Sequence, residues 1–102
     1  MVYTNDHEDI NQLLYEFTEL IDYTLSIEFV KRWKSKYSIK FLKLFQTRLI
    51  KAMSDRRPLK ITTLYTFMTK KCNYSKEQVI NFFDSIDISI YAPLISGNKR
   101  DL

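Results

Sequence analysis

The chain has a single glycine, Gly97, and two prolines, Pro58 and Pro93, in 102 residues. Glycine and proline are the residues that most often interrupt helices and build tight turns. So few of them favour long helices with short connections over a sandwich of many short strands. Apolar residues make up 45% of the chain, which is enough for a hydrophobic core, so a globular fold is expected rather than a disordered chain.

Apolar residues recur at the i, i+3, i+4, i+7 spacing of a helix in several segments. This spacing predicts helices at residues 6–25, 38–53, 63–71 and 75–86. A shorter helix is expected at residues 27–37, and the pattern leaves open whether it continues into the next one.

Helix starts and stops agree with these boundaries. Ser38 is a candidate N-cap, and Ser75 with Gln78 forms the S-x-x-Q pattern of a capping box. Pro58 ends the helix before it, because proline lacks the backbone donor that a helix needs. Residues 59–62 and 88–91 are rich in β-branched side chains, which predicts two short extended segments.

The expected fold is therefore all-α, mostly helical with four or five helices, and has a minimal β element. Residues 1–95 are expected to form a single helical domain, since the chain is long enough for one domain and small for two. Residues 96–102 have the composition of a flexible tail.

The order of the predicted elements in the second half is extended segment, helix, short turn, helix and strand. This order resembles the helix-turn-helix core of a winged-helix domain, with matching segments at residues 59–62, 63–71, 75–86 and 88–91. The resemblance implies a reduced winged helix, because few residues remain to build a wing. Its third helix would be the one that enters the DNA major groove in DNA-binding relatives. Glu77, Asp84 and Asp87 make that helix a poor groove reader, so a protein-binding role fits it better.

The composition argues against an enzyme and against a bound cofactor or metal. Gly97 is the only glycine, so a glycine-rich loop that cradles phosphates is absent. One histidine and one cysteine cannot form a four-ligand Cys/His zinc site. Cys72 and His7 would form a nucleophile–base pair only if folding brought them together, and Cys72 is more simply a half-buried turn residue.

Charge is distributed unevenly along the chain. Residues 1–28 contain seven acids and no Lys or Arg, whereas residues 29–72 contain thirteen bases and one acid. Residues 73–102 are nearly balanced. This asymmetry suggests an acidic partner for the middle of the chain or an internal pairing of two helices.

Within the stretch from Trp33 to Phe45, aromatic and basic residues alternate. A helix at residues 38–53 separates two sides. One is an apolar arc of Phe41, Leu42, Phe45, Leu49, Ala52 and Met53, and the other carries Lys40, Lys43, Thr47 and Lys51. The aromatic residues are expected to form a packing ridge rather than platforms for base stacking. The predicted nucleic-acid-binding residues are the basic ones of this region: Lys31, Arg32, Lys40, Lys43, Arg48, Lys51, Arg56 and Arg57.

These residues suggest a non-catalytic binding module that contacts the phosphate backbone of a nucleic acid, largely independently of sequence. DNA and RNA are not distinguished. The alternative is a protein-interaction module that meets an acidic protein surface or forms a homodimer. No membrane association is expected, and an intracellular location, cytoplasm or nucleus, is expected because no internal disulfide can form.

Overall fold

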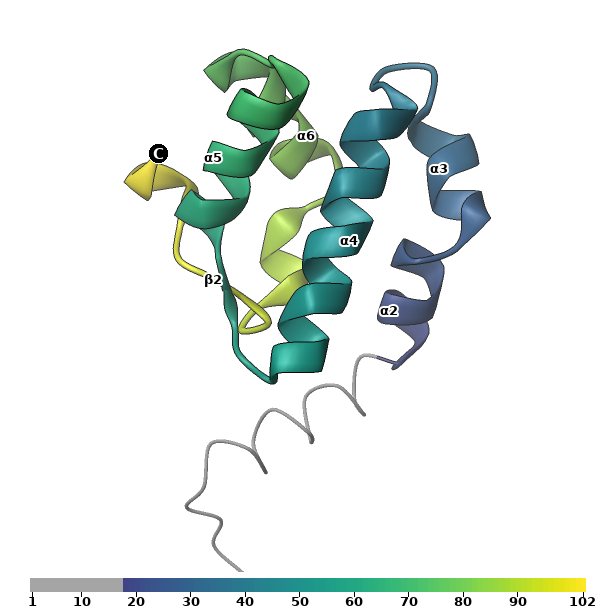
Figure 1. Cartoon of the computed structure of the whole chain (residues 1–102), viewed down its shortest axis with the longest axis vertical. Helices are drawn as coiled ribbons and strands as arrows, with labels where there is room; N and C mark the ends of the chain where they lie inside the picture. Colours follow the sequence, from purple (N-terminus) through teal and green to yellow (C-terminus); the bar gives the residue numbers. More distant parts are fainter. Residues whose placement is uncertain (1–17) are drawn as a thin grey trace, which may run out of the picture. The chain divides into compact units, whose positions relative to one another are not determined.

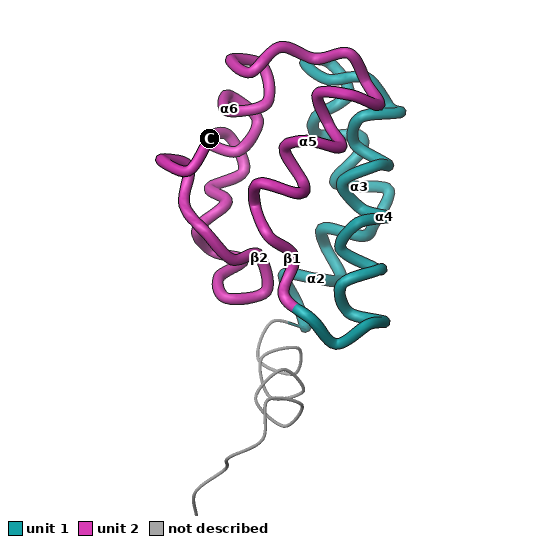
Figure 2. The backbone as a smooth tube through the Cα atoms, turned by 60° about the vertical axis from the view of Figure 1, so that its left-hand side comes forward, with its two compact units in different colours: residues 1–57 teal, residues 58–102 magenta. Residues whose placement is uncertain are grey.

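The computed structural model describes residues 18–102 of the chain. These residues form five α-helices, two short 3₁₀ helices and one sheet of two parallel strands (Figure 1). The prediction of a mostly helical fold with a minimal β element is therefore confirmed. The chain divides into two compact units, Met1–Arg57 (unit 1) and Pro58–Leu102 (unit 2), coloured separately in Figure 2. The single domain predicted for residues 1–95 stays a prediction.

Unit 1 contains α2 (Thr18–Thr24), α3 (Ile27–Trp33) and α4 (Ile39–Asp55). The first part of the helix predicted at residues 6–25 lies outside the described residues, and α2 covers most of the rest. Residues 34–38 separate α3 from α4, so the two helices are distinct.

The ends of α4 follow from its flanking residues. The Ser38 side chain accepts a hydrogen bond from the Phe41 backbone N–H at 3.1 Å, which satisfies one of the free donors of the first turn. At the other end Arg56 adopts a left-handed conformation with φ 54°, and its N–H bonds back to the Ala52 carbonyl. This cap ends the helix two residues before Pro58, at the position where the sequence predicts a stop.

Aromatic rings pack along unit 1. Phe29 of α3 stacks on Phe45 of α4 with ring centroids 5.9 Å apart, which joins the two helices. Tyr37 stacks on Phe41 at 5.4 Å and meets Trp33 at 6.4 Å. Tyr37, Phe41 and Phe45 are buried, as a packing ridge requires, whereas Trp33 is only half-buried.

The corner between α2 and α3 is tied to α4 by one amide. Gln46 Nε2 donates to the Thr24 carbonyl at 2.9 Å and to the Ser26 carbonyl at 3.1 Å. Thr24 is fully buried, and its hydroxyl donates to the Leu20 carbonyl at 2.7 Å. The Gln46 amide therefore bonds α4 to two carbonyls of the corner between α2 and α3.

Unit 2 is built around a parallel pair of two-residue strands, in which Leu59 pairs with Ile95 and Lys60 with Ser96. Parallel strands need a crossover connection, which the helices between them supply. The elements in chain order are β1 (Leu59–Lys60), α5 (Ile61–Cys72), α6 (Lys76–Ser85), η1 (Ile88–Tyr91), β2 (Ile95–Ser96) and η2 (Lys99–Asp101).

The strand predicted at residues 88–91 is wrong, because this segment forms the 3₁₀ helix η1. A strand would bury alternate residues, Ile88 and Ile90. Instead Ile88 and Tyr91 are buried and Ile90 is 42% exposed, which matches the three-residue repeat of a 3₁₀ helix. The extended segment predicted at residues 59–62 is also shorter than expected, since α5 begins at Ile61.

The segment predicted as a flexible tail, residues 96–102, makes ordered contacts within unit 2. Ser96 belongs to β2, and Asn98 caps η2 by accepting from the Arg100 N–H at 3.0 Å. Lys99 of η2 forms an ion pair with Asp84 of α6. The end of the chain therefore lies against α6, which differs from the loose tail that its polar composition predicts.

The capping box at α6 is confirmed. Ser75 Oγ accepts from the Gln78 N–H at 3.2 Å, and Gln78 Oε1 accepts from the Ser75 N–H at 2.8 Å. We expect Ser75→Ala to lower the free energy of unfolding by about 1 kcal/mol, because it leaves a first-turn donor to water. The matched control is Ser35→Ala, at an exposed serine of the loop between α3 and α4. Urea denaturation of both variants measures the difference, and equal losses would contradict the assignment.

Candidate functional site

The basic residues of α4 occupy one exposed face of this helix. Phe41, Leu42, Phe45, Leu49 and Ala52 are buried, which fixes the rotation of the helix about its axis. Lys40, Lys43, Thr47 and Lys51 are exposed on the opposite side, as predicted. We call Lys40, Lys43 and Lys51 the basic face of α4.

The basic face of α4 is long and poorly neutralised. Lys40 and Lys51 are eleven residues apart, so they are separated by about 16 Å along the helix axis. Lys51 lies 3.4 Å from Asp55 in an exposed i, i+4 ion pair. Lys40 and Lys43 form no ion pair with any of the residues 18–102. Because exposed pairs are weak, even Lys51 keeps most of its ability to attract an anion.

The two predicted residues on α3 have different surroundings. Lys31 is exposed and lies 3.9 Å from Glu28, a loose i, i+3 pair. The guanidinium carbon of Arg32 lies 5.1 Å from the centre of the Trp33 ring, within the range of a cation–π contact. Arg32 is therefore held over an aromatic side chain, which the sequence pattern alone does not show.

The remaining predicted residues follow the basic face along α4. Arg48 is half-buried, so it is a poorer candidate for phosphate contact than its position in the sequence implies. Arg56 and Arg57 are exposed just after the helix ends. All the predicted site residues belong to unit 1. They are distributed along α3 and α4: Lys31 and Arg32 on α3, Lys40 and Lys43 in the first turns of α4, Arg48 and Lys51 further along it, and Arg56 and Arg57 just after its end.

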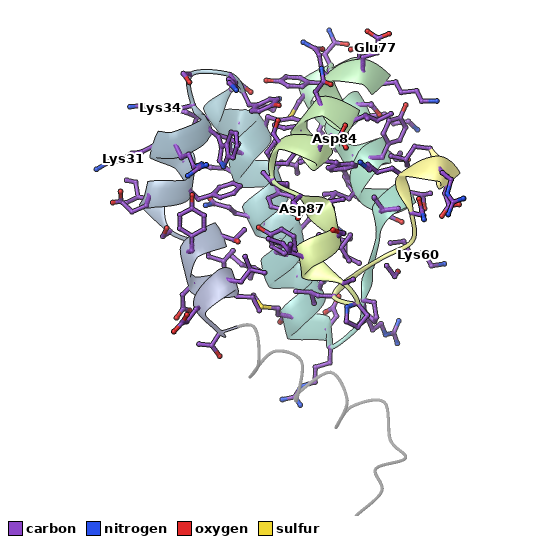
Figure 3. The ribbon with its side chains drawn as sticks, turned by 180° about the vertical axis from the view of Figure 1, so that it is seen from behind. Lys31, Lys34, Lys60, Glu77, Asp84 and Asp87 are labelled. Carbon is purple, nitrogen blue, oxygen red and sulfur yellow. The ribbon has the colours of Figure 1, made fainter. Side chains whose placement is uncertain are left out.

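The candidate set omits two lysines of the loop between α3 and α4. Lys34 and Lys36 are exposed, and Figure 3 shows the side chains of Lys31 and Lys34 extending away from the ribbon of α3. Both lie within the helix predicted at residues 27–37, and their charge alone could have placed them in the set.

Three isoleucines on unit 1 are unusually exposed. Ile27 is 66% exposed, Ile39 is 51% exposed and Ile50 is 50% exposed. Ile39 and Ile50 are eleven residues apart on α4, which is close to three helical turns, so they share one edge of the exposed face. Ile39 and Ile50 lie outside the apolar arc predicted for α4, which agrees with their exposure.

Groups that could carry other chemistry are scattered. Within residues 18–102, no cluster of three or more His, Cys, Asp or Glu side chains is placed to hold a metal ion. Cys72 is half-buried at the end of α5, and His7 lies outside the described residues. The described helices include none with the length and apolar character needed to cross a membrane.

Two carboxylates, one on α6 and one just after it, have partners of their own. Asp84 is paired with Lys99, and Asp87 accepts a hydrogen bond from Ser89 Oγ at 2.6 Å. Both side chains are exposed and are labelled in Figure 3 with Glu77. Exposed carboxylates on this helix would repel phosphate groups.

Comparison of the chain with protein-family models, curated proteins and solved structures finds no match.

Proposed function

We propose that the chain is a non-catalytic nucleic-acid-binding protein that contacts the phosphate backbone through unit 1. The observation that carries this proposal is the basic face of α4, where Lys40, Lys43 and Lys51 are exposed on a helix with no acid before Asp55. The apolar side of the helix, opposite these lysines, is buried, and this fixes the orientation of the basic face toward solvent.

Lysine suits backbone binding better than base reading. Its ammonium group is a flexible point charge, and binding to phosphates is favoured because condensed counterions are released. Base reading needs planar groups such as arginine, asparagine or glutamine placed against base edges in a groove. The basic face of α4 offers none of these, so the proposed binding depends on charge and only weakly on sequence.

For unit 2 we propose a structural role without direct contact to the nucleic acid. The order β1, α5, α6 and the three-residue connection 73–75 match three segments of the winged-helix resemblance, and the fourth does not match, because residues 88–91 form η1. The exposed acids Glu77 and Asp84 on α6 oppose a role for this helix in a DNA groove. The proposed nucleic-acid contact therefore rests on unit 1.

The experiment compares salt dependence in two triple variants. The first, Lys40→Glu, Lys43→Glu and Lys51→Glu, changes the basic face of α4. We expect the slope of log affinity against log salt on duplex DNA to flatten by roughly three units, since each phosphate contact contributes about 0.9. Fluorescence anisotropy on labelled single- and double-stranded oligonucleotides of about 20 nucleotides measures it across a salt series.

The matched control is Lys70→Glu, Lys71→Glu and Lys76→Glu, which makes the same change in net charge at exposed lysines of unit 2. The control variant is expected to keep a slope close to that of the original chain. Equal flattening in both triple variants would mean that net charge alone drives binding. Absence of binding by the original chain at low salt would disprove the proposal.

A second candidate function is binding to an acidic protein surface or to a second copy of the chain. The exposed Ile27, Ile39 and Ile50 favour it, because aliphatic side chains contribute affinity to protein interfaces and little to phosphate binding. Such binding would depend weakly on salt, whereas backbone binding depends on it steeply.

A further inference from the structure

Trp33, at the end of α3, is the one tryptophan of the chain and the most accessible ring in its row of aromatic residues. It is half-buried, whereas Tyr37, Phe41 and Phe45 are buried. One contact of the indole is Tyr37, at 6.4 Å between ring centroids and 55° between ring planes. Among these four rings, only Trp33 can reach a ligand.

The accessible ring is paired with a guanidinium group. The guanidinium carbon of Arg32 lies over the indole, 5.1 Å from its centre. Guanidinium is planar and weakly hydrated, so it stacks well on aromatic rings and on nucleic-acid bases. Arg32 is exposed, so a ligand can reach its side chain from solvent.

Lysines surround this pair. Lys31, Lys34 and Lys36 are exposed within four residues of Trp33, and Figure 3 shows Lys31 and Lys34 extending outward. The only acid of α3 is Glu28, which lies at a loose 3.9 Å from Lys31. The local charge is therefore strongly positive, and the stacking group lies among cations that can bind phosphates on either side of one nucleotide.

We propose that Arg32 and Trp33 form a stacking platform for an unpaired base, so that the preferred ligand is single-stranded nucleic acid. This inference rests on the proposed function. In a duplex the faces of the bases are stacked on one another and unavailable, whereas every base of a single strand can offer its face. The flanking lysines bind the phosphates of that strand, and the basic face of α4 continues the same contact.

Arg32→Lys tests the platform, because it keeps the positive charge and removes the planar guanidinium group that would stack on a base. We expect affinity for a single strand to fall about tenfold, the loss of one stacked base. The salt slope is expected to stay unchanged, and so is the affinity for a duplex of equal length. The matched control is Arg100→Lys on the exposed 3₁₀ helix η2 of unit 2, which is expected to change neither affinity.

The measurement is fluorescence anisotropy with labelled oligo-uridine, oligo-thymidine and a DNA duplex. Both an RNA and a DNA single strand are tested, because their bases present the same faces to a stacking group. A titration with unlabelled oligo-thymidine also follows the intrinsic tryptophan fluorescence. Trp33 is the one tryptophan of the chain, so this signal reports on the proposed platform. Binding is expected to change that fluorescence in the original chain and less so in Arg32→Lys. A melting curve checks that the variant is folded.

The outcomes separate this inference from the proposed function. If the original chain binds nucleic acid but Arg32→Lys binds single strands equally well, the platform is wrong and backbone binding stands. If Arg32→Lys loses affinity for single strand and duplex alike, Arg32 is only a phosphate contact and the platform is again wrong. If the original chain binds no nucleic acid at low salt, the proposed function fails as well.

Discussion

Gly97→Ala is expected to destabilise the chain by about 3 kcal/mol. Gly97 has φ +99°, a conformation that side chains other than glycine rarely adopt. A Cβ atom at this position would lie 2.8 Å from Ile61 Cγ2, closer than any normal contact. Ile61 is only 2% exposed, so it has little room to move away. Backbone strain and overpacking therefore add.

Thermal unfolding followed by circular dichroism is expected to show a midpoint lower by about 10–20 °C for Gly97→Ala. A double-mutant cycle with Ile61→Ala separates the two causes, since it removes the atom that the new Cβ meets. If the clash dominates, the loss caused by Gly97→Ala shrinks when Ile61 is already Ala. A midpoint unchanged by Gly97→Ala would contradict the close packing of the C-terminal segment on α5.

The helices were largely predictable because their determinants are local. The apolar arc at helical spacing predicted α4, and its buried residues are those of the arc except for the half-buried Met53. Ser38 and Ser75 marked helix starts since an N-cap bonds within its own first turn. Such bonds depend on a few neighbouring residues, which a sequence displays directly.

Features that depend on distant residues were not predictable. The segment Ile88–Tyr91 has the composition of a strand, yet it forms a 3₁₀ helix that buries residues 88 and 91 and contacts α6 and β2. At the end of the chain, Ser96 pairs with Lys60 and Lys99 pairs with Asp84, and both partners are distant in the sequence. Neither partner of a distant contact carries a local pattern that identifies the other.

The candidate site was predictable to the same extent. The exposure of Lys40, Lys43 and Lys51 follows from helical periodicity and was predicted. The partial burial of Arg48 and the placement of Arg32 over Trp33 were not, because they depend on the direction of long side chains. The predicted packing ridge is confirmed for Tyr37, Phe41 and Phe45, which are buried. Trp33 is only half-buried, and this partial exposure is the basis of the stacking proposal.

Gln46→Glu is expected to lower the free energy of unfolding by about 2 kcal/mol at neutral pH. The Gln46 amide donates to the carbonyls of Thr24 and Ser26, and a carboxylate of the same shape has no donor to offer. Its oxygen would instead face two carbonyl oxygens at close range. This disfavours the charged form, so the folded state raises the pKa of the introduced carboxyl above its ordinary value.

The pH dependence follows from that raised pKa. A protonated carboxyl can donate to one of the two carbonyls, so stability relative to the original chain is recovered at low pH and lost as pH rises through the folded pKa. Urea denaturation at about pH 7 and about pH 3.5 measures this difference, because the lower pH lies below the ordinary pKa of Glu, about 4.3. The matched control is Gln78→Glu, because the Gln78 side chain accepts a hydrogen bond from the Ser75 N–H and glutamate can do the same. The control variant is expected to keep its stability at neutral pH. An equal loss in both variants, or a loss at Gln46 that does not diminish on acidification, would show that the amide does not hold the corner of α2 and α3 against α4.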